Sequence, residues 1–92
     1  MKNDASSQYI RIIAETQSIS AAAAKLGISQ PALSAYLKKL EVRLGVALFD
    51  RSVLPIRITE AGKAYLEYID GVNELFVEFQ KKIGEGKNEE QI

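Results

Sequence analysis

Apolar residues near the start of the chain recur at the spacing of an α-helix. Ile10 and Ile13 fall on one face of a segment of residues 7–16, and polar residues occupy much of the rest of that segment. This alternation predicts a first amphipathic helix that buries one face. Residues 17–19 lack the pattern and are expected to form a short connector.

A short alanine-rich segment follows the connector. We expect Ser20 to cap a helix over residues 21–26, because a serine hydroxyl can accept a hydrogen bond from a free amide of the first turn. Gly27 is expected to end this helix, since glycine readily takes the left-handed conformation found there. The small side chains would let a neighbouring helix approach closely.

Leucines then recur at spacings of four, three and four residues, which is the period of a helix with one buried stripe. Ser29 is a second candidate cap, and Pro31 falls in the first turn, where its missing N–H costs nothing. Gly45 marks the expected end. A short helix, a turn with glycine and a second capped helix predict a helix-turn-helix. The residues of the expected buried stripe are Leu33, Leu37, Leu40 and Leu44.

Two short runs rich in apolar and β-branched residues come next, over residues 46–51 and 56–58. They are separated by residues 52–55, which include a proline. This pattern predicts a β-hairpin, the wing of a winged helix-turn-helix.

A long final segment begins after Thr59, another candidate cap, and carries apolar residues at spacings of four and three over nearly three heptads. That period suits pairing between helices. We expect a homodimer, with the end near Leu66 folding back on its own domain and the distal part covered by a second copy. The expected interface residues are Tyr65, Ile69, Val72, Phe76, Phe79 and Ile83.

The predicted fold is therefore mainly α, with a three-helix core, a short β-hairpin wing and a long dimerisation or linker helix. Residues 1–58 are expected to form the winged helix-turn-helix and residues 59–84 the linker helix. Glycines at 84 and 86 are expected to end that helix, leaving residues 85–92 as a tail or interdomain linker.

The composition narrows the possible functions. The chain has neither cysteine nor histidine, which excludes disulfides, thiolate metal sites and the commonest general base. We therefore expect no enzyme, cofactor or metal site. No apolar run is long enough to cross a membrane and no signal-peptide pattern opens the chain, so a cytoplasmic protein without a membrane partner is expected.

Charge is segregated along the chain, although the formal net charge is zero. Residues 1–63 carry nine basic and five acidic side chains, whereas residues 64–92 carry three basic and seven acidic ones. The basic residues 1–63 suit contact with phosphate, and the acidic residues 64–92 would then face away from the phosphate. Ordinary scatter of surface charge explains the same counts about as well.

Three motifs carry a family resemblance. Residues 29–34 read Ser-Gln-Pro-Ala-Leu-Ser, residues 44–51 read Leu-Gly-Val-Ala-Leu-Phe-Asp-Arg, and residues 59–62 read Thr-Glu-Ala-Gly. At these spacings they resemble the DNA-binding domain of LysR-type transcriptional regulators, and the resemblance covers roughly residues 7–83.

The resemblance implies sequence-specific binding of double-stranded DNA by a dimer, with the third helix in the major groove and the long helices of two copies antiparallel. Members of this family also carry a large C-terminal effector-binding domain, for which the residues after Gly84 are too few. We therefore expect no small-molecule effector site here. Whether the chain is a fragment or a naturally short protein stays open.

Elementary chemistry supports DNA contacts near the start of the third helix. The free amides and partial positive charge of a helix N-terminus favour a phosphate, and Gln30 can form two hydrogen bonds with adenine. Gln30, Ser34 and Lys38 share a helix face that lies away from much of the leucine stripe. The residues expected to contact DNA are Ser20, Ser29, Gln30, Pro31, Ser34, Ala35, Lys38, Arg51 and Arg57.

Several of these positions have a structural interpretation of similar weight. Ser20 and Ser29 are explained equally well as helix caps. Arg51 either braces the wing or reaches a phosphate, and Arg57 is also compatible with an ordinary solvated charge.

Two departures from the family pattern weaken the expected DNA contact. Ala35 stands where the family commonly has arginine, and Val53 and Leu54 occupy a wing tip that is often basic. Fewer cations mean fewer phosphate contacts, so one module alone should bind weakly. The alternative function is a winged-helix dimerisation or protein-interaction module with little DNA binding.

Overall fold

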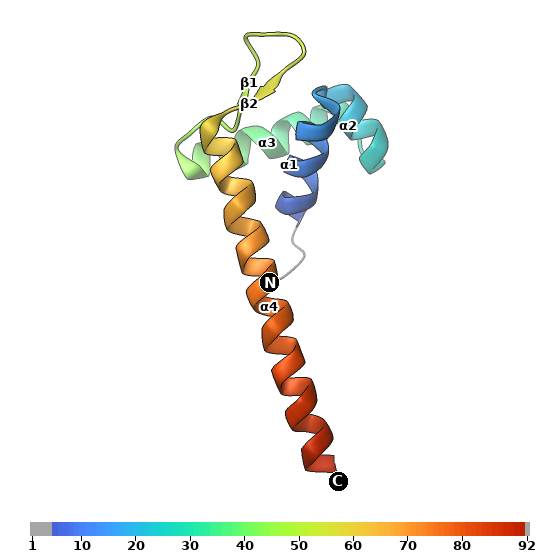
Figure 1. Ribbon diagram of the computed structural model, residues 1–92. Helices are drawn as coiled ribbons and strands as arrows, with labels where there is room; N and C mark the ends of the chain where they lie inside the picture. The colour runs from blue at the N-terminus through green and yellow to red at the C-terminus, as the bar shows by residue number, and fades with distance from the viewer. Residues whose placement is uncertain (1–4, 92) are drawn as a thin grey trace.

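The computed structural model describes residues 5–91, which form three helices in a cluster, a hairpin and a long final helix (Figure 1). The hairpin projects beyond the cluster at one end, and the final helix leaves it as a rod. This arrangement confirms the predicted winged helix-turn-helix. The elements in chain order are α1 (Ala5–Thr16), α2 (Ile19–Leu26), α3 (Gln30–Leu44), β1 (Phe49–Asp50), β2 (Arg57–Ile58) and α4 (Glu60–Gln91).

Helix α2 begins two residues earlier than the sequence predicts. Ser18 has an extended backbone, and its Oγ accepts a hydrogen bond from the N–H of Ala21 at 3.1 Å. The prediction that Ser20 caps this helix is therefore wrong, and Ser20 lies exposed in the first turn. Both serines have the chemistry of a cap. The difference is that Ile19 packs against the core, and this contact draws it into the helix.

The two ends of α3 are as predicted. The Oγ of Ser29 accepts a hydrogen bond from the N–H of Ala32 at 3.2 Å, and Pro31 lies in the first turn. At the other end, Gly45 takes a left-handed conformation with φ of 77°, which L side chains rarely adopt. Local chemistry therefore fixes where this helix starts and stops.

The core lies between the three clustered helices and the base of the hairpin. The prediction that Leu44 completes the buried stripe of α3 is wrong, because its side chain is 41% exposed. The last turn of α3 extends past the core, and Leu48 fills this end instead, fully buried after the turn at Gly45. The buried cluster consists of Ile10, Ile13, Ala22, Ala23, Leu33, Leu37, Leu40, Leu48, Phe49 and Ile56.

The wing is an antiparallel pair in which Phe49 faces Ile58 and Asp50 faces Arg57. Its strands are only two residues long, shorter than the apolar runs that predicted them. Phe49 is buried and its neighbour Asp50 is exposed, which gives the strand one core face and one solvent face.

Thr59 joins the wing to α4 and caps the helix as predicted. Its Oγ1 accepts a hydrogen bond from the N–H of Gly62 at 3.0 Å and donates one to the carbonyl of Ala47 at 2.7 Å. Helix and wing approach closely here: a Cβ on Gly62 would lie 2.3 Å from the carbonyl oxygen of Leu48. Only glycine fits this junction without a shift of the backbone.

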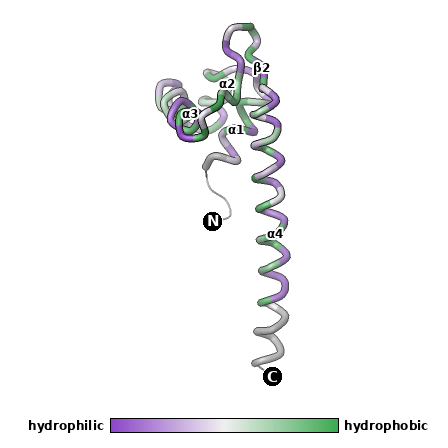
Figure 2. The backbone as a smooth tube through the Cα atoms, turned by 90° about the vertical axis from the view of Figure 1, so that its left-hand side faces the viewer, coloured by the Kyte–Doolittle hydropathy of each residue, from purple (hydrophilic) through white to green (hydrophobic). Residues whose placement is uncertain are grey.

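Helix α4 continues to Gln91, so the prediction that it ends at Gly84 is wrong. A glycine inside a helix costs only about 1 kcal/mol relative to alanine, which the helix-forming residues around it can offset. The start of α4 packs on the domain through buried Ile69, and an ion pair joins Asp70 to Arg11 of α1. Farther along, beyond the cluster, apolar positions recur on one side of the rod, the side on which the cluster lies (Figure 2).

Candidate nucleic-acid interface

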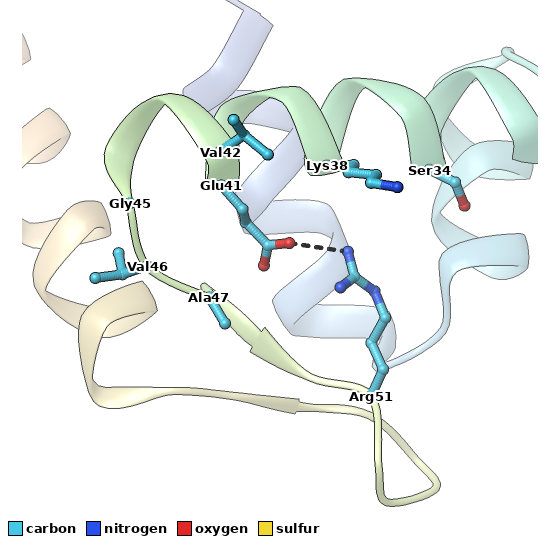
Figure 3. Close-up of a pocket in the computed structure, with 8 residues that line it drawn as sticks. All are labelled: Ser34, Lys38, Glu41, Val42, Gly45, Val46, Ala47 and Arg51. Carbon is cyan, nitrogen blue, oxygen red and sulfur yellow. Dashed lines mark hydrogen bonds and ion pairs between the residues drawn. The ribbon is translucent and has the colours of Figure 1, made fainter.

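A groove of about 620 Å³ separates α3 from the wing (Figure 3). Ser34 and Lys38 project from α3 on one side, and Arg51 reaches in from the wing on the other. Basic groups therefore stand on both walls of one groove. The lining residues are Ser34, Lys38, Glu41, Val42, Gly45, Val46, Ala47 and Arg51.

Glu41 holds the wing against α3. Its Oε2 accepts hydrogen bonds from the backbone N–H groups of Leu48 at 2.7 Å and Phe49 at 3.2 Å, while Oε1 accepts one from Arg51 Nη2 at 3.2 Å. Its side chain is only 12% exposed, so these charge-assisted bonds form largely away from water. The role of Glu41 carries no signal in the sequence, because no local pattern reveals partners seven and eight residues away.

Both arginines of the wing lie near an acidic residue, and Arg51 forms an ion pair. Arg51 meets Glu41, which supports the bracing interpretation, although its side chain stays 44% exposed. Exposed Arg57 faces Asp50 across the hairpin. Hydrogen bonds from the side chain and the backbone N–H of Ser52 hold the pKa of Asp50 below its usual range, and the charge of Arg57 adds to this.

The start of α3 presents polar groups beside the groove. Gln30 Nε2 donates a hydrogen bond to Ser34 Oγ at 3.0 Å, which links two of the predicted DNA-contact residues on one face. Pro31, Ala35 and Lys38 are exposed alongside them. Ser29 uses its hydroxyl oxygen as a cap, as the structural interpretation of this residue requires.

The structure thus brings some predicted contact residues together and leaves others apart. Ser34, Lys38 and Arg51 line the groove, and Gln30 adjoins it through its bond to Ser34. Ser20 on α2 and Arg57 on β2 do not line it. Their contacts with DNA, like those of the other residues, remain predictions.

The six residues predicted to form the dimer interface, called the seam below, are partly buried and partly exposed. Ile69 is 8% exposed, and Tyr65 packs against the core of its own domain. Beyond them Val72, Phe79 and Ile83 are 40%, 55% and 44% exposed. The exposed part of the seam therefore begins at Val72, about two helical turns after the first predicted residue, Tyr65.

Within the described residues, no group of three or more acidic side chains is placed to hold a metal ion. None of the helices described by the structure is long and apolar enough to cross a membrane.

Residues 6–63 match the sequence model of the family described as bacterial regulatory helix-turn-helix protein, lysR family. The chain belongs to the LysR family. This assignment agrees with the resemblance of the three sequence motifs and with the observed fold.

Relatives within the LysR family include the HTH-type transcriptional regulator TfdS of Cupriavidus pinatubonensis, 43% identical over 60 residues, which are 65% of this chain and 20% of TfdS. A probable RuBisCO transcriptional regulator of Thalassiosira pseudonana is 38% identical over 87 residues, 91% of this chain and 28% of the relative. The chain thus spans about a quarter of such regulators.

Solved structures include a crystal structure of the CbnR_DBD–DNA complex. It has a TM-score of 0.72 and 33% identity to this chain, and the match covers 88% of this chain and 93% of that one. The similarity extends over nearly the whole of both chains, so it includes the winged helix-turn-helix and most of α4.

Proposed function

We propose that the chain is the DNA-binding module of a LysR-type bacterial transcriptional regulator. In this proposal it binds double-stranded DNA sequence-specifically, with α3 in the major groove, and acts as a dimer in the cytoplasm without catalytic activity. The observation that carries the proposal is the groove between α3 and the wing, with Lys38 and Arg51 on opposite walls. A DNA complex of similar fold gives it further support.

The groove suits one strand of the DNA backbone. A duplex carries a phosphate every few ångströms along each strand, so a strand lying between α3 and the wing would pass cations on both sides. Lys38 is exposed on the helix wall, and the side chain of Arg51 stays partly exposed while Glu41 orients it. The strand would then separate α3 in the major groove from the wing.

Phosphate contacts position the module, and base contacts provide specificity. The N-terminal residues of a recognition helix are those that reach base edges. Gln30 lies there and is exposed. Its amide donates a hydrogen bond to Ser34, and an edge of a base can take the place of this partner. We assign base reading chiefly to Gln30 and phosphate contact to Lys38 and Arg51.

The exposed seam of α4 supports a homodimer. Val72, Phe79 and Ile83 form an apolar surface that the domain itself leaves uncovered. The antiparallel arrangement of the two helices is the one that the family resemblance implies. A dimer would also double the contacts of a weakly binding module.

The test of this function is a comparison of two duplexes. Sequences that bind are first selected from a pool of random duplexes, and the affinity for a selected duplex is then compared with that for a scrambled duplex of equal composition. We expect the selected duplex to bind at least a hundredfold more tightly, within the ordinary range of specific regulators. Equal affinity, or no binding at low salt, would instead favour the protein-interaction module.

A further inference from the structure

The tip of the wing carries an apolar side chain that has no role within the domain. Leu54 is 88% exposed, more than any other large hydrophobic residue of the described part of the chain. Its neighbours Ser52, Val53 and Pro55 carry no charge, so the tip offers no cation to a phosphate. We propose that Leu54 enters the minor groove of bound DNA as an apolar wedge and bends the duplex; this rests on the proposed function.

The loop that carries Leu54 is held at both ends. On the β1 side, the carboxylate of Asp50 accepts hydrogen bonds from the Oγ of Ser52 and from its backbone N–H, the latter at 2.9 Å. On the β2 side, Ile56 is buried in the core and its carbonyl accepts a hydrogen bond from Gln17 Nε2 at 3.2 Å. The tip therefore projects as a braced loop (Figure 1), and inserting it would cost little ordering entropy.

The position of the wing determines which groove it meets. If one DNA strand lies between Lys38 and Arg51, α3 occupies the major groove on one side of that strand. The groove on the other side of the same strand is the minor groove, and the wing tip extends beyond Arg51 in that direction. Leucine is one of the side chains that proteins insert between base steps from the minor groove, and such insertion kinks the duplex toward the major groove.

The apolar tip predicts a contact that differs from that of a basic wing. A cation releases counterions when it meets a phosphate, so it raises the salt dependence of binding. Insertion of Leu54 is favourable instead because its apolar surface leaves water, and this contribution to the binding free energy is nearly independent of moderate salt. It should also favour duplexes with a pyrimidine–purine step at the insertion point, since these steps kink most easily.

The test uses Leu54→Ala and the matched control Val77→Ala. Val77 is also an exposed aliphatic residue, 49% exposed, but it lies on α4 outside the seam and the groove. Affinity for a duplex selected with the unmodified chain is measured from 50 to 200 mM salt, and its bend by energy transfer between dyes at its two ends. We expect Leu54→Ala to weaken binding about tenfold and to straighten the DNA, with the salt slope unchanged. Val77→Ala should change neither property.

A second variant, Leu54→Arg, distinguishes the wedge from an ionic wing. It should leave the DNA straighter than the unmodified chain does, and raise the salt slope by about 0.9 for each wing that contacts DNA. The inference is overturned if Leu54→Ala binds and bends the selected duplex as the unmodified chain does, or if its salt slope falls. In those cases the proposed function still stands. Failure of the unmodified chain to bind any duplex overturns both.

Discussion

The winged domain buries most of its large apolar residues, whereas the distal half of α4 leaves most of its own exposed. All ten members of the buried cluster come from residues 10–56, in elements that cover one another. By contrast, six of the ten large hydrophobic residues exposed in the described part of the chain lie on α4, five of them from Val72 onward. The domain therefore covers its own apolar residues, whereas the distal helix leaves its apolar side exposed, as the proposed dimer requires.

This comparison predicts that the same substitution has very different effects in the two regions. Leu37 is fully buried in α3 and Leu75 is 67% exposed on α4. Leu37→Ala should lower the free energy of unfolding by about 3.5 kcal/mol, through lost burial and the cavity left behind. Leu75→Ala should lower it by less than about 0.5 kcal/mol at a concentration where the chain is monomeric. Urea denaturation followed by circular dichroism measures both, and comparable losses would end the distinction between the regions.

The exposed seam gives the next largest expected effect. Phe79→Ala removes one ring from each copy, so the dimer loses two rings from its interface. We expect its dissociation constant to rise roughly a hundredfold, with the unfolding of the winged domain unchanged. Sedimentation equilibrium measures the constant, and Val77→Ala on the same helix is the control. If both variants associate equally well, the seam is not the interface.

Substitution of a glutamate should also affect stability differently in the two regions, by a smaller amount. Glu41 is nearly buried and accepts three hydrogen bonds, whereas Glu74 is exposed on α4. Glu41→Gln should cost about 1.5 kcal/mol of unfolding free energy, because the amide cannot replace a charged acceptor of two N–H groups and Arg51. Glu74→Gln should cost less than about 0.5 kcal/mol. Thermal unfolding of the two variants compares them, and equal midpoints would show that Glu41 does not hold the wing.

Features that depend on local chemistry were predictable from the sequence. The Ser29 cap and the left-handed Gly45 follow from the intrinsic preferences of serine and glycine, and both were predicted. Thr59 was predicted for the same reason. The helical period also predicted α3 and the long final helix with its exposed seam.

Features that depend on distant contacts were not predictable in this way. The choice between Ser18 and Ser20 as cap depends on the packing of Ile19. The exposure of Leu44 depends on where the next segment turns back to the core. The three bonds of Glu41 join residues seven or more positions apart, and one of them supports the bracing interpretation of Arg51.

The most direct test of the central claim is the salt dependence of DNA binding by the groove between α3 and the wing. Affinity for a selected duplex is measured over a range of salt for the unmodified chain, for Lys38→Ala and for Lys81→Ala, which removes the same charge from α4. We predict a linear loss of affinity with log salt, with a slope smaller by about 0.9 per module for Lys38→Ala and unchanged for Lys81→Ala. Equal slopes for all three chains would contradict the assignment of this groove to DNA.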